Sequence, residues 1–188
     1  MPQFYISLLF IFLLISCSES PQEEVKNIKL HSGTANKNLV LIEQKKYDTD
    51  KSVRVTFKKT TDGSNIKIPI EWFHTQAAKE FLNSGKNNYI GNPEMISQGK
   101  KRYNMWSCSQ CHGPTARGQV GPGLTGPNFK YAKNATNIGM FETIWAGTNG
   151  GMGAKGFGLM TSDDGIKPDE LLKIIAFIRS NGKLGGNQ

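Results

Sequence analysis

The chain has few of the residues that most often bind metals: three cysteines and three histidines among 188 residues. A structural zinc site needs four such ligands, and His31, His74 and Cys17 have no ligand spacing relative to the pair Cys108 and Cys111. No internal repeat is visible, and the apolar stretch near the N-terminus is shorter than the about 20 residues of a membrane-spanning helix. These shortages argue against a structural zinc site and against a spanning helix in that stretch.

The chain does contain one strong motif, the five residues from Cys108 to His112 (CSQCH). Two cysteines separated by two residues and followed at once by a histidine are the attachment sequence of a c-type haem. Each thiol adds across one vinyl group of the porphyrin, so that the imidazole is held under the ring, where it can ligate the iron. A thioredoxin-like dithiol is the alternative, but that motif opens a helix within a βαβ unit, and the Gly- and Pro-rich sequence after the motif contains none. We predict one covalent haem c on Cys108 and Cys111, with His112 as an axial ligand.

The N-terminal residues resemble an export signal, which a c-type haem protein needs because its haem is attached outside the cytoplasm. Phe4 to Ile15 is almost entirely apolar and has the length of a signal-peptide core, although no Lys or Arg precedes it. The sequence LISC, which ends at Cys17, resembles a bacterial lipobox, in which the cysteine is lipidated and becomes the mature N-terminus. An ordinary signal peptide is the alternative, but it leaves one exported thiol unexplained. We expect a periplasmic lipoprotein anchored to the membrane through Cys17.

The charge balance is basic, with 23 Lys and Arg against 15 Asp and Glu and a formal net charge of +8. A basic protein can bind nucleic acid, an anionic membrane or an acidic protein. An exported haem protein has little access to nucleic acid, so we expect no nucleic-acid partner. Most of the lysines form an ordinary solvated surface. Lys100, Lys101 and Arg102, just before the haem motif, and Arg117, just after it, are candidates for docking to a protein partner.

Changes in composition divide the chain into segments. Residues 53–57 and 66–70 each alternate apolar and polar side chains, and the sequence DGSN between them is a turn signal, so the pair is predicted to form a β-hairpin. The predicted segments are a lipoprotein-type signal peptide at 1–16, a polar tether at 17–36, a β-containing extension at 37–75 and a haem domain at 76–188.

The predicted haem domain shows helical periodicity, and Gly-rich loops at 118–126 and 147–158 lie between its later helices. Such loops let the backbone lie close to a flat ligand. The predicted helices are Thr75 to Asn83 with Gly85 as its stop, a helix from Pro93 into the haem motif, Asn137 to Ala146, and a last helix that starts near Pro168 and is capped by Gly182.

An electron carrier needs a sixth iron ligand, and a methionine thioether opposite the histidine is the usual one. Met140 lies on a helix face, where packing is the expected role. Met152, between glycines, lies in the second Gly-rich loop, and Met160 follows that loop in the sequence GLMT (158–161). Loop residues carry function more readily than those on a helix face. Both remain candidates from the pattern alone.

Several segments resemble the cytochrome c-L family of class I c-type cytochromes, the electron acceptors of calcium or lanthanide methanol dehydrogenases. The likeness covers about residues 76–182 and is carried by the segments CSQCHGPTARGQVGPGL (108–124), TNIGMFE (136–142), GGMG (150–153) and PDELLKIIAFIR (168–179), together with EFLNSGKNNY (80–89). Members of this family are usually acidic and soluble, whereas this chain is basic and carries the lipobox-like sequence.

The resemblance implies a mainly α fold, a class I cytochrome c domain, here with the N-terminal β-containing extension. It implies Met152 as the second axial ligand, with Met160 as the second choice, and Pro122 as the residue whose carbonyl accepts the other imidazole N–H. Pro122 could instead simply shape its loop. Leu124 and Trp145, with Tyr131 and Phe157, are expected to line the haem, although each could be an ordinary core residue.

Three functions are consistent with these residues. The first is a carrier that takes single electrons from a quinoprotein dehydrogenase, with methanol dehydrogenase implied by the resemblance, and passes them to another cytochrome or an oxidase. The second is the same carrier role for another dehydrogenase or respiratory complex. The third is a haem enzyme with an open iron site, which the resemblance disfavours. Coordination of the iron separates the third from the others, because a carrier has ligands on both faces of the haem.

Overall fold

The computed structural model describes residues 54–157 and 162–182, with only the backbone of Ser162, and all of them belong to one compact unit, Thr49–Gln188. The predictions for the signal peptide, the tether, Cys17 and Met160 lie outside these residues. Within the described residues no helix is both long and apolar enough to cross a bilayer.

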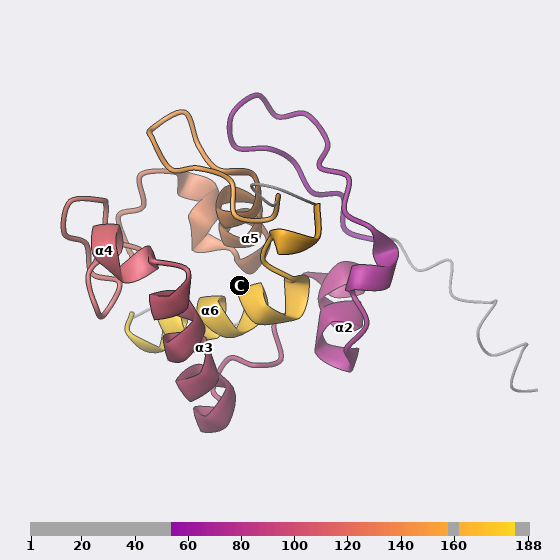
Figure 1. The fold of residues 1–188 in the computed structure, drawn as a ribbon, viewed down its shortest axis with the longest axis horizontal. Helices are drawn as coiled ribbons and strands as arrows, with labels where there is room; N and C mark the ends of the chain where they lie inside the picture. Colours follow the sequence, from indigo (N-terminus) through magenta and orange to yellow (C-terminus); the bar gives the residue numbers. More distant parts are fainter. Residues whose placement is uncertain (1–53, 158–161, 183–188) are drawn as a thin grey trace, which may run out of the picture. The chain divides into compact units, whose positions relative to one another are not determined.

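Helices make up the regular structure of the described residues (Figure 1). The predicted mainly α class is confirmed. The helices are α2 (Gln76–Ser84), α3 (Pro93–Met105), α4 (Cys108–His112), α5 (Asn137–Ala146) and α6 (Pro168–Ser180), with short 3-10 turns η1 (Ile70–Trp72), η2 (Ala132–Ala135) and η3 (Ser162–Asp164).

The β-hairpin predicted in the extension is not confirmed. Lys58 and Asn65 form a single antiparallel bridge, and the described residues contain no strand. The predicted second strand ends in the 3-10 turn η1 instead. The turn between the segments is present, because the Asp62 carboxylate accepts hydrogen bonds from the Ser64 backbone N–H (2.9 Å) and hydroxyl (2.7 Å). Two backbone hydrogen bonds join the segments, from the Lys59 N–H to the Ser64 carbonyl and from the Ile66 N–H to the Phe57 carbonyl (both 2.8 Å). Of the alternating side chains, Phe57 and Ile66 are buried, whereas Ile70 is exposed.

The helix boundaries follow from local capping. Thr75 accepts a hydrogen bond from the backbone N–H of Ala78, and Asn92 caps α3 in the same way immediately before Pro93. Gly85 ends α2 with φ +74°, a left-handed conformation that favours glycine. These boundaries agree with the sequence prediction.

The C-terminus of α6 differs from the prediction. The helix ends at Ser180 with Asn181 as its C-cap, and not with Gly182. A Cβ atom on Gly182 would lie 2.4 Å from the carbonyl oxygen of Thr125. Glycine is needed here because the chain passes close to the loop after the haem motif.

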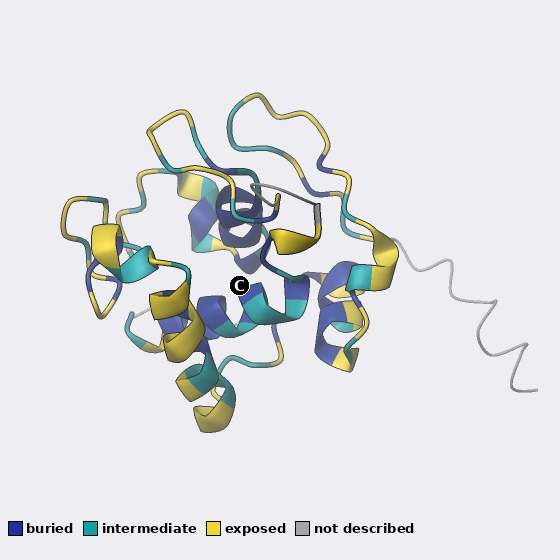
Figure 2. Cartoon of the chain, in the orientation of Figure 1, coloured by how far each residue is buried: buried dark blue, intermediate teal, exposed yellow. Residues whose placement is uncertain are grey.

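The closest helix contact brings α3 against α6. A Cβ atom on Gly99 would lie 2.0 Å from the carbonyl oxygen of Lys173, so the two backbones touch at this point. One turn further on, the rings of Tyr103 and Phe177 are 5.2 Å apart between centroids, and both side chains are buried. This crossing joins the end of α3, which leads into the haem motif, to a helix that is largely buried (Figure 2).

The described part of the extension packs on the same core as the helices. Phe57 and Phe73 stack with ring centroids 6.1 Å apart, and Phe57 lies 5.0 Å from Phe141 of α5. Phe81 of α2 also lies 5.0 Å from Phe141. Burying several phenyl rings in one cluster adds specific ring contacts to the hydrophobic free energy, so the extension is part of what holds α5 in place.

Polar contacts fasten the same segment to α5. The buried Glu142 carboxylate accepts the backbone N–H of Lys58 (2.6 Å) and forms an ion pair with Lys133 of η2 (2.6 Å). The hydroxyls of Thr60 and Thr143 are 2.9 Å apart. The buried charge of Glu142 is therefore paired, as a carboxylate removed from water must be.

Candidate haem site

The haem motif forms a helix of its own, α4, and the loop after it folds back beneath the imidazole. Gly121 donates its backbone N–H to the Cys111 carbonyl (2.7 Å), which brings Pro122 under His112. Nδ1 of His112 lies 2.8 Å from the Pro122 carbonyl oxygen. A carbonyl can only accept a hydrogen bond, so Nδ1 carries the proton and Nε2 is left with its lone pair. This is the arrangement that an iron ligand requires, and the site includes the Pro122 contact that the resemblance implied.

The two thiols of the motif lie at one edge of the site. Cys108 is half-buried, Cys111 is exposed, and the two are not joined by a disulfide. Burial is the main cause that raises the pKa of the Cys108 thiol to about 11, although the charge of Lys155 opposes it. Redox-active dithiols work through a lowered thiol pKa, so the environment of Cys108 does not suit a thioredoxin-like couple.

The loop that carries Met152 is held by main-chain hydrogen bonds. Thr148 donates its N–H to the Met152 carbonyl (2.8 Å), and Lys155 donates its N–H to the Ile144 carbonyl of α5 (3.1 Å). Gly156 continues this pattern with a bond to the Trp145 carbonyl (3.0 Å). The loop therefore runs back along α5, and Met152 is half-buried at its inner side.

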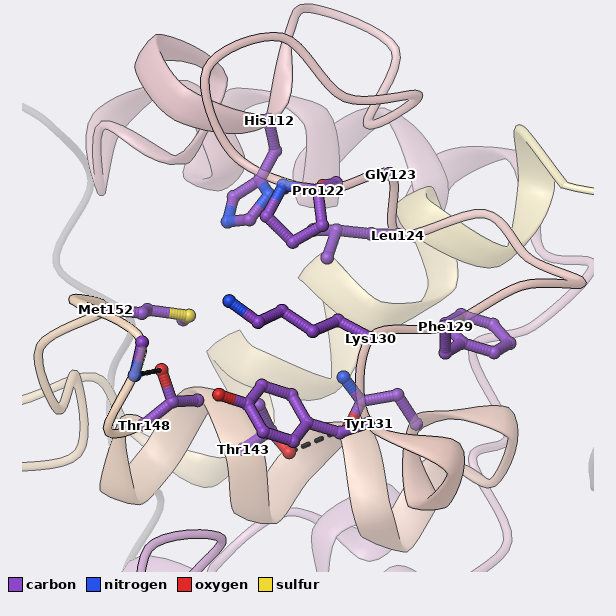
Figure 3. A pocket seen from close by; sticks show the side chains of 12 residues that line it. His112, Pro122, Gly123, Leu124, Phe129, Lys130, Tyr131, Thr143, Thr148 and Met152 are labelled. Carbon is purple, nitrogen blue, oxygen red and sulfur yellow. Dashed lines mark hydrogen bonds between the residues drawn. The ribbon is translucent and has the colours of Figure 1, made fainter.

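His112 and Met152 lie on opposite sides of the same space (Figure 3). Both residues line each of three adjoining cavities. One cavity is bordered by both cysteines. Another is lined by apolar core residues such as Leu124 and Met140. The remaining one is lined by residues 129–131. Two thiols at an edge, an imidazole with a free Nε2, a thioether opposite and apolar walls are the set of groups that a c-type haem uses. The residues present fit a haem, and in the described residues no group of three or more His, Cys, Asp or Glu could hold a bare metal ion instead.

The residues expected to line the haem fall into two groups. Leu124 and Tyr131 line the space between His112 and Met152. Trp145 lines none of the three cavities: it is buried against Phe141, at 5.3 Å between ring centroids, and its indole N–H has no hydrogen-bond partner in the described structure. Phe157 packs on the same side as Trp145, 6.5 Å away. Trp145 therefore has a core environment, whereas Phe157 is 49 % exposed.

Three site residues were not anticipated from the sequence. Lys130 lines the cavity beside Tyr131, and Lys155 lines the cleft that contains the cysteines. Val120 lines the same cleft and is 87 % exposed. An isolated lysine or valine in a loop gives no sequence signal. The exposed apolar side chain of Val120 beside the thiols shows, in the structure, that this edge of the site is accessible.

Comparison with known proteins agrees with this geometry. Residues 96–182 match the cytochrome c family. Over 105 residues the chain is 40% identical to cytochrome c-L of Methylorubrum extorquens strain AM1, covering 56% of this chain and 49% of that protein, so the chain spans about half the length of this curated relative.

Two solved structures resemble the described fold. Cytochrome cL from the marine methylotroph Methylophaga aminisulfidivorans is 34% identical, with a TM-score of 0.59, and the match covers 68% of this chain and 81% of that one. Cytochrome cL from Hyphomicrobium denitrificans is 36% identical, with a TM-score of 0.60, covering 68% and 73%. Fold and site together define a c-type cytochrome of class I. The chain belongs to the cytochrome c-L family, and membership implies covalently bound haem c.

Proposed function

We propose that the protein carries single electrons through one haem c attached to Cys108 and Cys111, with His112 and Met152 as the axial ligands. The observation that carries this proposal is the placement of the His112 imidazole and the Met152 thioether on opposite sides of one space. Ligands on both faces leave no open position for a substrate, which favours a carrier over a haem enzyme.

The haem, when bound, supplies the one-electron couple of its iron, and the protein keeps the ligands fixed. Pro122 holds the ring of His112 through Nδ1, and the main-chain bonds of its loop hold Met152. Leu124 adds an apolar contact to the same space. Rigid placement of both ligands keeps structural change on reduction small, and the methionine raises the reduction potential.

The edge with the cysteines is the proposed electron port. Cys111 is exposed, so the edge of a haem attached there is within reach of a partner, and Val120 offers an apolar contact beside it. Lys100, Lys101 and Arg117 are exposed close to the motif in sequence, while Arg102 is paired with Glu170 at 3.2 Å. An apolar contact with a basic surround suits a weak complex with an acidic partner surface.

The relatives in the cytochrome c-L family support a methanol dehydrogenase as the electron donor, and the proposed acceptor is another cytochrome or an oxidase. To test the donor, the purified cytochrome is mixed with methanol dehydrogenase of the same organism, with and without methanol. We expect reduction of the haem only when methanol is present. Rapid reduction by a different dehydrogenase, with none by this one, would reject the methanol assignment and keep the carrier role.

Covalent attachment is tested independently. Acid–acetone extraction should leave the haem on the polypeptide, at one haem per chain, and replacement of Cys108 or Cys111 by alanine should reduce attachment. Extractable haem, or zinc in its place, would remove the basis of the proposed function.

The proposed location is the periplasmic face of a membrane, with Cys17 as the lipidated residue. This rests on the sequence of residues 1–17 alone. In a bacterium with lipoprotein processing, the protein should partition with membranes, and Cys17→Ala should release it or block its maturation. Soluble wild-type protein cleaved at another position would reject the anchor and leave the cytochrome assignment intact.

A further inference from the structure

Arg179, near the end of α6, is a buried cation that the proposed function does not use. It is 2 % exposed, and no other Lys or Arg of the described residues is buried. Burial lowers the pKa of its guanidinium, but arginine stays protonated in proteins. The core therefore holds one full positive charge at this position.

No anion of the described residues neutralises this charge. The ion pairs in this part of the chain do not include Arg179. Its Nε donates to the amide oxygen of Asn137 (3.3 Å), and Nη2 donates to the carbonyls of residues 134, 135 and 136 (2.8, 3.1 and 2.9 Å). Nη1 is buried and has no hydrogen-bond partner within the described residues. Glu142 is the contrast, because its buried charge is paired with Lys133.

The guanidinium lies close to the haem site. Asn134, whose carbonyl accepts one of its N–H groups, lines two of the cavities that His112 and Met152 also line. The ring centroid of Phe129 is 5.7 Å from Cζ of Arg179, and Phe129 lines one of these cavities. At both points a single residue separates the charge from the space between the two proposed iron ligands.

A positive charge fixed at such a position acts on the oxidation state of the iron. It favours the ferrous haem, because the ferrous state carries one positive charge fewer than the ferric state. Salt screens charges at the surface, but it screens buried charges much less. The bonds to three consecutive carbonyls also hold the guanidinium in place, so its effect on the iron should be constant over a wide range of salt.

We infer that Arg179 raises the reduction potential of the haem through its uncompensated buried charge, from outside the ligand pair His112 and Met152. This inference rests on the proposed function, because it requires a haem at the site, and it is independent of which dehydrogenase is the electron donor. A higher potential makes the oxidised cytochrome a stronger acceptor of electrons.

The test is a redox titration of the purified holoprotein, followed by absorption, at low and at high salt. Arg179→Gln keeps a hydrogen-bond donor but removes the charge, and it should lower the potential by the same amount at both salt concentrations. Arg179→Lys keeps the charge and should stay near the wild-type potential. If Arg179 acted only by tying the three carbonyls together, both variants would lose that fork of donors and would shift together.

Asn137→Asp gives a second test that leaves the arginine in place. The Asn137 side chain already accepts the N–H of Nε, so a carboxylate there would neutralise the guanidinium. An acidic residue in the first turn of a helix is favourable, and the fold of α5 should persist. This variant should also lower the potential, and it decides the matter if Arg179→Gln does not fold. Asn92→Asp, the same change at the exposed N-cap of α3, is the matched control and should leave the potential near the wild-type value at high salt.

A wild-type potential in both Arg179→Gln and Asn137→Asp would overturn the inference. An equal fall in Arg179→Lys, or a fall that disappears at high salt, would overturn it as well. Each of these results leaves the carrier role intact. A purified chain without covalent haem, visible at once in its absorption spectrum, would instead remove the proposed function together with this inference.

Discussion

At the scale of single residues, the ligand methionine is the feature that separates a carrier from a haem enzyme. Met152→Ala should remove the thioether from the iron, abolish the long-wavelength charge-transfer band of oxidised Met-ligated haem and lower the reduction potential. Absorption spectroscopy and a redox titration measure both effects. Met160→Ala is the control and should change neither. The reverse result would assign the ligand to Met160, and an unchanged spectrum in both variants would favour an open iron site.

Residue-level prediction from sequence is most specific where a motif fixes a chemical role. The CSQCH motif and the loop proline are read directly from spacing and resemblance, and the structure places His112, Pro122 and Met152 around one space. Lys130 could not be found in this way, because its place at the site depends on which cavity its side chain reaches. For Trp145 the haem-lining role stays a prediction, because an aromatic residue on an apolar helix suits a haem wall and a protein core equally well.

At the scale of helices, the crossing of α3 and α6 depends on the absence of a side chain. Glycine in the middle of a helix usually lowers stability by about 0.5–1 kcal/mol relative to alanine. If helix propensity alone determined stability, Gly99→Ala would therefore stabilise the protein. We expect destabilisation by about 1–3 kcal/mol instead, because the added Cβ would lie 2.0 Å from the Lys173 carbonyl oxygen. Urea denaturation measures the change. Gly153→Ala is the control, since nothing lies within 4 Å of a Cβ there.

The N-terminus of α6 contains a carboxylate network that makes stability depend on pH. Asp169 accepts hydrogen bonds from Thr75 (2.7 Å) and Tyr89, and it forms an ion pair with Lys173 (3.0 Å). Burial on its own would raise the pKa of Asp169, but these bonds outweigh it and hold the pKa below 3.8. Burial, reinforced by the neighbouring carboxylate, raises the pKa of Tyr89 to about 12.

Asp169→Asn should therefore destabilise the protein at pH 7 by about 1–3 kcal/mol. The folded-state pKa is depressed, so the stabilisation is fully present above the unfolded value near 3.8 and is lost as the pH falls through the folded value. Urea midpoints of the two proteins should converge in that acidic range. Asp163→Asn, at an 81 % exposed side chain, should change the midpoint little at any pH. A difference between the urea midpoints of the wild type and Asp169→Asn that stays constant into strong acid would contradict the role of the Asp169 carboxylate network.

Helix boundaries were the most predictable part of the fold, since Thr75, Pro93 and Gly85 mark helix ends by local mechanisms. The exception is the end of α3, which stops at Met105 and does not run into the haem motif as predicted. The hairpin is not confirmed: residues 66–70 alternate in sequence, but the described residues form only the single bridge between Lys58 and Asn65, and a ladder also needs a partner strand in register. The interpretation of Gly182 as a cap failed because a nearby loop, and not the helix end, demands glycine there.

At the scale of the whole molecule, the basic charge should control encounter with the electron donor. Changing Lys100, Lys101 and Arg117 together to glutamate should slow reduction by the dehydrogenase about tenfold or more at low salt, because steering by charge raises association rates by 10–10³. Stopped-flow kinetics over a salt series measures this, and the wild-type rate should fall as salt shortens the screening length. Lys79→Glu, on the exposed side of α2, is the control. Equal slowing by Lys79→Glu would reject a local docking surface.

The contact between α3 and α6 has a consequence for the order in which the protein is made. Its two sides, Gly99 and Lys173, lie before and after the haem motif in the chain, so they cannot meet until the last helix has been synthesised. Without the last helix this contact cannot close the core behind Cys108 and Cys111. A chain that stops before Pro168 should accordingly acquire covalent haem yet lack the absorption band of methionine ligation. The contact that joins α3 to α6 therefore depends on the part of the chain that follows Pro168.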